Sequence, residues 1–228
     1  MDLRNNLLKG THVAPPLVIS PVLNMESASV SETEREYCYY VELGDFSVLR
    51  NLSKRILDQE QWSFPTNGRG TMRMRKEVEI QLDYEEAVAT PVGDVSYTQT
   101  LKLWKDAAYT GVSLSNEVTF PVDEKTFAAF KHLSDNGMTK RRFEIPFEFT
   151  LVPEEGEEVG KKLPALLEVD VFFDSEGHYQ PWAKIDVETK AILNQAPTFP
   201  FPVGEVIEPT AEKSVRDHIL NTYFLTRK

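Results

Sequence analysis

The segment TMRMRKEVEIQL, which runs from Thr71 to Leu82, alternates apolar and polar side chains over most of its length. One face carries the apolar side chains of Met72, Met74, Val78, Ile80 and Leu82. The opposite face carries the polar side chains of Arg73, Arg75, Glu77, Glu79 and Gln81. A period of two indicates a β-strand with one buried face, so we expect a long half-buried strand here.

The same alternation recurs along the chain and predicts about seven strands. The clear cases are residues 140–151, 167–173 and 183–188, and the weaker ones are 97–105, 112–120 and 37–43. Within 140–151, only Arg141 interrupts the apolar face. Strands of a parallel sheet are buried on both faces, whereas each of these segments has one polar face. We therefore expect a mainly antiparallel sheet, packed as a sandwich or curled into a barrel.

Three helices are expected beside the sheet, which makes the fold class α+β. Asp45 is a candidate N-cap for a helix through about Gln59, with apolar residues at helical spacing. Asp123 is a candidate N-cap for a second helix, which should stop at Gly137 where a left-handed residue is needed. Thr210 is expected to cap a third. The acidic, glycine-containing stretch 152–162 is typical of an exposed hairpin loop.

Composition narrows the classes of partner. The chain has 228 residues, 41% hydrophobic and 27% charged, which is ordinary for a folded protein. It has 25 Lys and Arg against 36 Asp and Glu, a formal net charge of −11. That balance argues against duplex nucleic acid as a partner, because such affinity comes from basic side chains that neutralise phosphates. A local basic cavity is still compatible with it.

The single cysteine, Cys38, excludes an internal disulfide and favours a reducing compartment, so we expect a cytoplasmic protein. Prolines interrupt the apolar stretch 13–23, and no segment approaches the ~18 to 20 apolar residues of a membrane-spanning helix. We therefore expect no membrane association. Residues 1–36 should form a loosely ordered N-terminal arm, and residues 37–228 a single domain.

The polar faces of the predicted strands are strongly charged. Six cations lie on them: Arg73, Arg75, Lys102, Lys140, Arg142 and Lys184. Ten acids accompany them: Glu42, Glu77, Glu79, Glu117, Glu144, Glu148, Glu168, Asp170, Asp186 and Glu188. These faces are either the solvated outer surfaces of a sandwich or the lumen of a barrel. A lumen of this kind would suit a polyphosphate held by the cations together with a divalent metal held by the carboxylates.

Several short motifs resemble, in order, those of the CYTH or triphosphate tunnel metalloenzyme superfamily. RMR at 73–75 is similar to its Arg-x-Arg strand, TLK at 100–102 to its Thr-Ile-Lys strand, and KRRF at 140–143 to its Lys-x-Arg-Tyr strand. EVDVF at 168–172 resembles the Ile-Asp-Val-Phe strand, and 183–187 falls where the family has Ala-Glu-Val-Glu-Phe. The resemblance covers residues 37 to 224.

The resemblance implies an antiparallel β-tunnel, closed or nearly closed, with a polar lumen and helices packed outside. It implies that a triphosphate-containing ligand binds in the lumen and is hydrolysed with a divalent metal, with adenylyl cyclase chemistry as the less favoured variant. The phosphate-binding residues would be Arg73, Arg75, Lys102, Lys140, Arg142 and Lys184. Weakly bound Mg²⁺ or Mn²⁺ would lie on Glu42, Asp170, Asp186 and Glu188. No catalytic residue is assigned.

The chain also departs from the family pattern. The strand before the first helix has Cys38, Tyr40 and Glu42 in place of Glu-x-Glu-x-Lys, and Lys184 replaces a carboxylate. A further strand retains only Glu117 of its charged residues. The alternative is therefore an eroded tunnel that acts as a ligand-binding or protein-interaction module. Hydrophobic closure of the lumen, by Tyr40 or Trp104 for example, would count against a triphosphate.

Overall fold

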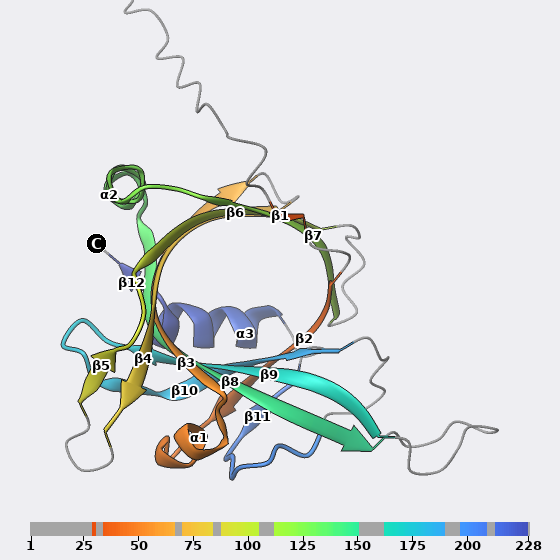
Figure 1. The fold of residues 1–228 in the computed structure, drawn as a ribbon. Coiled ribbons are helices and arrows are strands. Elements are labelled where there is room, and N and C mark those ends of the chain that lie inside the picture. The colour runs from red at the N-terminus through yellow and green to blue at the C-terminus, as the bar shows by residue number, and fades with distance from the viewer. Residues whose placement is uncertain are drawn as a thin grey trace, which may run out of the picture.

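The computed structural model describes residues 29–30, 34–66, 70–83, 88–104, 112–150, 162–189, 197–208 and 213–227. This part of the chain is mostly β-strand, with a few short helices between groups of strands (Figure 1). The strands are β1 (Ser29–Val30), β2 (Glu34–Glu42), β3 (Arg55–Thr66), β4 (Gly70–Leu82), β5 (Ala89–Pro91), β6 (Ser96–Trp104), β7 (Val112–Pro121), β8 (Asn136–Thr150), β9 (Lys162–Phe173), β10 (Tyr179–Glu188), β11 (Val206–Ile207) and β12 (Thr226–Arg227). The helices are α1 (Ser47–Leu52), α2 (Glu124–Leu133), α3 (Lys213–Ile219) and the π-helix η2 (Leu220–Phe224).

The long strands form one antiparallel sheet in the order β7-β6-β4-β3-β8-β9-β10-β2. β2 also pairs with β7 over four residue pairs, from Glu34↔Ser115 to Tyr37↔Val112. The sheet is strongly curled, and Figure 1 looks along the axis of the curl. The antiparallel, β-rich fold with few helices expected from the alternation is therefore confirmed.

The strand register places the predicted polar faces on one continuous surface. Arg73 pairs with Thr100, Lys102 with Glu117, Arg142 with Asp170, and Asp170 in turn with Lys184. Residues directly opposite each other in a ladder share a face. We call this surface the charged concave face, and its members are Arg73, Arg75, Glu77, Lys102, Glu117, Lys140, Arg142, Glu168, Asp170, Lys184 and Asp186.

The apolar faces point the other way and form most of the core. The larger cluster lies over β2, β8, β9 and β10 and includes Leu49 of α1 and Phe201 of the 197–208 segment. A smaller cluster joins Trp62 and Met74 to Phe127 of α2. Both helices lie outside the ring of strands in Figure 1. Because the apolar clusters lie on the side of these helices, the charged face is the concave one.

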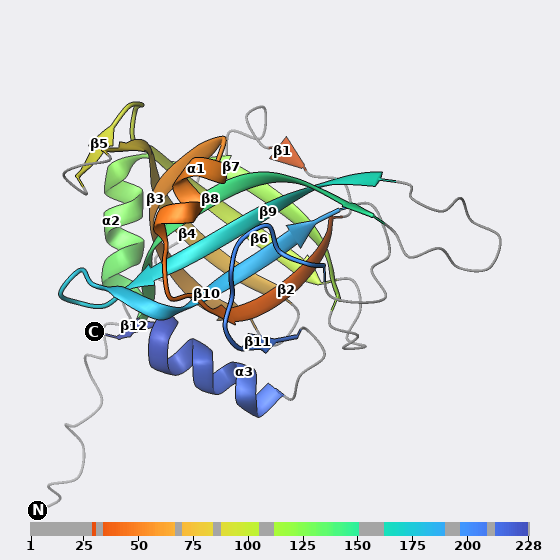
Figure 2. The same cartoon turned by 90° about the horizontal axis from the view of Figure 1, so that it is seen from below.

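α3 has a different position, across one end of the curled sheet (Figures 1 and 2). Ile219 of α3 and Phe224 of η2 pack with Tyr40, Phe172 and Trp182 in a separate apolar cluster. The ring of Phe224 stacks on Phe172 at 3.8 Å and contacts Tyr40 edge-on at 5.2 Å. This end of the concave face is apolar and covered. Among the described helices, none combines the length and the apolar character needed to cross a membrane.

The expected helix from Asp45 to Gln59 is wrong over its second half. α1 stops at Leu52, where the Ser53 hydroxyl donates to the carbonyl oxygen of Leu49 at 2.6 Å and Ser53 itself is extended. Residues 55–66 form β3, which pairs along its length with both β4 and β8. The helical spacing of apolar residues does not decide the conformation here. The strand is favoured because the two ladders supply hydrogen-bond partners for the backbone groups on both of its edges.

The second helix begins as predicted, because the Asp123 side chain accepts a hydrogen bond from the Thr126 N–H at 2.7 Å. It ends at Leu133, however, and the expected left-handed stop at Gly137 is wrong, since Gly137 lies within β8 without a positive φ. A Cβ atom there would lie 2.6 Å from the Trp62 ring, so this glycine makes room for an aromatic side chain.

Three other predictions fall wholly or partly outside the described residues: the cap at Thr210, the loop at 152–162 and most of the N-terminal arm 1–36. Within that arm, Ser29–Val30 pairs with β7, and β2 begins at Glu34. The sheet thus starts before the domain boundary expected at residue 37.

Candidate functional site

All six cations predicted to bind phosphate lie on the charged concave face. β4 carries Arg73 and Arg75, β6 carries Lys102, β8 carries Lys140 and Arg142, and β10 carries Lys184. The cations are two residues apart within β4 and within β8, which is the spacing that keeps two side chains on one face of a strand.

On β8 and β9, the cations are held by buried carboxylates. Asp170 is fully buried (0% exposed side chain), and both of its oxygens accept hydrogen bonds. Arg142 donates to Oδ1 at 2.7 Å and to Oδ2 at 2.9 Å, and Lys140 also bonds Oδ2. Arg142 additionally bonds Glu168. Burial by itself raises the pKa of Asp170, but the charges of Arg142 and Lys140 outweigh it and hold the pKa well below its usual range.

β10 adds a second lysine–aspartate pair. The Lys184 ammonium bonds Oδ2 of Asp186, and the register sets Lys184 directly opposite Asp170 on β9. Asp186 is buried, whereas Lys184 keeps 27% of its side chain exposed. Lys184 is therefore the most accessible of the six cations.

On the opposite side of the concave face, β4 and β6 hold a looser group. One carboxylate oxygen of Glu117 lies 3.2 Å from the Arg73 guanidinium, and the other lies 3.0 Å from the Lys102 ammonium. Arg75 donates to the Gln61 side-chain oxygen at 3.1 Å and lies 3.8 Å from Glu77. The Nε atoms of Arg73 and Arg75 are both buried, and neither has a hydrogen-bond acceptor among the described residues.

These surroundings change the pKa of Arg75. Its burial, and then the like charges of Arg73 and Arg142, lower the pKa of Arg75 to about 9. Arginine has an ordinary pKa of ~12.5 or more, and burial is the larger cause of the lowering, with the neighbouring cations second. An anion placed here would favour the charged form of the guanidinium against both effects.

The four predicted metal ligands do not form a group. Asp170 already binds two cations, and Asp186 binds Lys184. Glu42 is exposed and pairs in register with Trp182 of the apolar end, while Glu188 is half-buried at the far end of β10. Within the described residues, no three His, Cys, Asp or Glu side chains come together as a metal site. These residues do not fit the divalent metal that the family resemblance implies.

Two residues of this face could not be placed from the sequence, because β3 was taken for a helix. Gln59 is buried and donates to Glu77 at 2.6 Å, and Gln61 orients Arg75. The alternation of Gln59, Gln61 and Ser63 with larger side chains was the signal for them.

Tyr40 lies on the concave face within the apolar end, opposite Lys184 in register. The expectation from the sequence is that hydrophobic closure of the lumen counts against a triphosphate; Tyr40 contributes to the apolar cover of this end, but Lys184 beside it keeps 27% of its side chain exposed. The Trp104 side chain lies outside the described residues.

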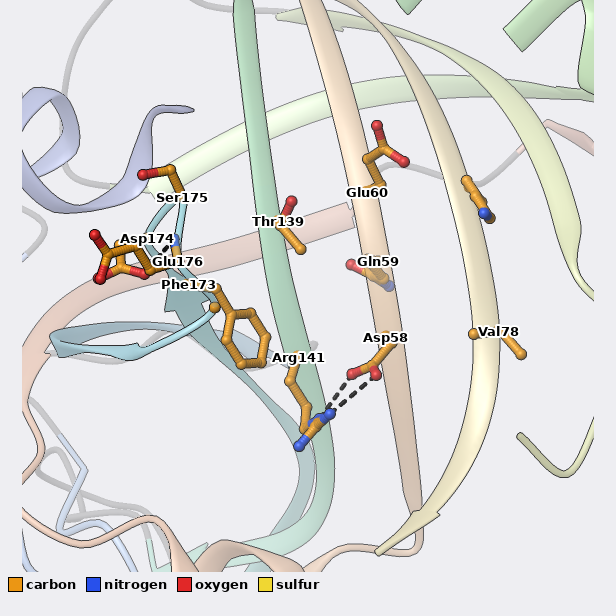
Figure 3. Close-up of a pocket in the computed structure, with 12 residues that line it drawn as sticks. Asp58, Gln59, Glu60, Val78, Thr139, Arg141, Phe173, Asp174, Ser175 and Glu176 are labelled. Atoms are coloured by element: carbon orange, nitrogen blue, oxygen red, sulfur yellow. Dashed lines mark hydrogen bonds and ion pairs between the residues drawn. The ribbon is translucent and has the colours of Figure 1, made fainter. Parts of the chain in front are cut away.

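A groove of about 630 Å³ lies elsewhere, between β3, β4 and the β9–β10 turn (Figure 3). Arg141, which interrupted the apolar row, makes a forked pair there with Asp58 at 2.7 and 2.9 Å and donates to the Tyr179 hydroxyl at 2.6 Å. Its guanidinium also lies over the Phe173 ring, 5.5 Å from the ring centre. Arg141 is thus engaged in structural contacts on the outer side of the sheet.

No protein-family model and no curated protein sequence matches the chain. Among solved structures, the chain is similar to the PH1819 protein from Pyrococcus horikoshii OT3, with a TM-score of 0.39 and 16% sequence identity. The match covers 70% of this chain and 80% of that chain.

Proposed function

We propose that the chain is a divergent triphosphate tunnel protein of the CYTH superfamily, and that its charged concave face binds a small molecule carrying a triphosphate. One observation carries the proposal: Arg73 and Arg75 stand on one face of β4, and the buried Nε atom of each has no hydrogen-bond acceptor among the described residues. Buried donors without acceptors are uncommon, and at binding sites the acceptor is supplied by the ligand.

The six cations divide into two groups by accessibility. Lys140 and Arg142 keep only 5% and 9% of their side chains exposed and are bound to Asp170. The other four range from 13% for Arg75 to 27% for Lys184. We therefore assign the phosphate contacts to the accessible group, Arg73, Arg75, Lys102 and Lys184. Lys140 and Arg142 act as positive charges behind them.

The residue types suit phosphate. A guanidinium offers a planar fork of donors that matches two phosphate oxygens, and an ammonium offers a compact charge to a third. Arg73 and Arg75 stand two residues apart on one strand face, so a chain of linked phosphates can contact both.

Two activities share this binding step. One is hydrolysis of the triphosphate, which the family resemblance favours. The other is binding alone by an eroded tunnel, which the capture of Asp170 and Asp186 by protein cations favours. We infer binding as the activity for which the described residues are sufficient.

Calorimetric titration with tripolyphosphate, ATP and thiamine triphosphate tests the proposal. Hydrogen bonds to charged groups contribute about 1.5 to 3 kcal/mol, so Arg73→Ala and Arg75→Gln should each weaken binding roughly 10- to 100-fold. Lys162→Gln is the matched control, because it removes one positive charge from an exposed surface pair.

Thermal unfolding should show that the Arg73→Ala variant keeps a melting temperature close to that of the parent. Phosphate release measured in the same samples separates hydrolysis from binding alone. Failure of all three triphosphates to bind, or equal affinity in the two arginine variants and the parent, would refute the proposed function.

A further inference from the structure

We propose that the polyanion binds the charged concave face without a divalent metal, and that Lys184 and Lys140 provide the positive charge that a metal would otherwise supply. The inference rests on the proposed function and specifies how that site recognises its ligand. It also departs from the metal dependence that the family resemblance implies.

The first support is the state of the Asp170 carboxylate. Both of its oxygens accept hydrogen bonds from Arg142, and Oδ2 also receives Lys140. A metal ion at Asp170 would have to compete with these three donors and approach the positive charges of Arg142 and Lys140. Both cations are buried, and a buried cation that loses its partner is strongly unfavourable. The charge of Asp170 is therefore already compensated by cations of the protein.

The second support is the position of Lys184. Its ammonium bonds Asp186, the next carboxylate on the same face of β10, and its register partner on β9 is Asp170. An ammonium group in this position repels a divalent cation at either carboxylate, and the low dielectric of a covered site strengthens that repulsion. The same ammonium attracts a phosphate oxygen.

Free Mg²⁺ also binds triphosphates in solution and lowers the negative charge that they present. If protein cations alone recognise the ligand, then Mg²⁺ competes with them. We therefore expect tripolyphosphate to bind at least as tightly in EDTA as in excess Mg²⁺ or Mn²⁺. A metal-dependent site would instead bind tripolyphosphate more tightly in Mg²⁺ or Mn²⁺ than in EDTA.

The test titrates tripolyphosphate calorimetrically into the full chain in EDTA, in excess Mg²⁺ and in excess Mn²⁺. The variants are Lys184→Glu, which adds a carboxylate, and Lys184→Gln, which removes the charge alone. Both should bind more weakly than the parent in EDTA, and only Lys184→Glu should regain affinity with Mn²⁺. Electron paramagnetic resonance of Mn²⁺ with the protein alone should show the ion free in the parent.

Binding by the parent that appears only with metal would overturn the inference and leave the proposed function standing. Manganese bound by the parent alone would also overturn it. Absence of binding of tripolyphosphate, ATP and thiamine triphosphate in every condition would instead refute the proposed function, and this inference with it. Circular dichroism of both variants shows whether they fold, and Lys184→Gln keeps the test decisive if the Glu variant does not.

Discussion

Replacement of Asp170 by Asn is the most direct test of how the concave face is stabilised. The substitution keeps the shape of the side chain but removes a charge that holds both Lys140 and Arg142. Asn can still accept through one oxygen, but its amide group would present donors to two cations. Of the carboxylates bound to these two buried cations, the variant leaves only Glu168, which bonds Arg142.

Removing one partner of a buried ion pair destabilises a protein by about 3 to 5 kcal/mol. The free energy of unfolding of a domain of ordinary stability is only about 5 to 15 kcal/mol. The Asp170→Asn variant should therefore fold but lose much of that free energy. With a urea m-value of about 3 kcal/mol per M, the unfolding midpoint should fall by about 1 to 1.7 M. Intrinsic tryptophan fluorescence during urea denaturation at neutral pH measures this change.

The matched control is Glu148→Gln, which removes a carboxylate from an exposed pair with Lys162, 3.6 Å apart. Exposed pairs contribute about 0 to 1 kcal/mol, so the midpoint of the control should scarcely move. If Asp170→Asn lost less than about 1 kcal/mol, the buried network would not be a stabilising unit, and our reasoning about its capture of Asp170 would be wrong.

The pH dependence gives an independent check. The pKa of Asp170 is lowered in the folded state, so the stabilisation from its ionised form is fully present above the unfolded value of ~3.9 and is lost as pH falls. The asparagine variant has no such group to protonate. The stability difference between parent and variant should therefore shrink below about pH 4, by about 1.4 kcal/mol per pH unit. A difference that stays constant in acid would contradict the lowered pKa.

Two further predictions concern the fold. Gly137→Ala should destabilise the protein by about 1 to 3 kcal/mol through overpacking, because the new Cβ would lie 2.6 Å from the Trp62 ring. Gly44→Ala, where nothing lies within 4 Å, is the control in chemical denaturation, and equal effects at both sites would refute the steric argument. Asp123→Ala should lower the melting temperature, because it removes the acceptor for the Thr126 N–H at the start of α2. Asp123→Asn should retain most of the stability, and a larger loss in the Asn variant would contradict the capping role.

The long strands could be predicted from the sequence because their two faces meet different surroundings. The outer face packs against other apolar groups, while the concave face carries charge, so the period of two is preserved in β4, β8, β9 and β10. β3 could not be recognised in the same way. Leu49, Leu52 and Ile56 recur at helical spacing across the end of α1. The conformation of β3 is fixed by pairing with the next strand, β4, and with β8, which is distant in the sequence.

For the site, the alternation identifies which residues share a face but not which of them bind each other. Arg142 meets Asp170 because β8 and β9 pair in one particular register across the hairpin. A slip by one residue would put the two side chains on opposite faces. The capture of Asp170 by two cations, and hence its loss as a metal ligand, could therefore not be inferred from motifs that place each residue separately.

The same arrangement explains how the chain tolerates so many buried charges. Lys140 and Arg142 share Asp170, Arg142 also bonds Glu168, and Lys184 bonds Asp186, so three cations meet three carboxylates on this side of the face. Arg73 and Arg75 are matched less completely, and it is there that the unsatisfied Nε atoms lie. If structural pairing alone governed the face, the unmatched donors should be the exposed ones, where water satisfies them. They are buried, and this favours a ligand as their acceptor.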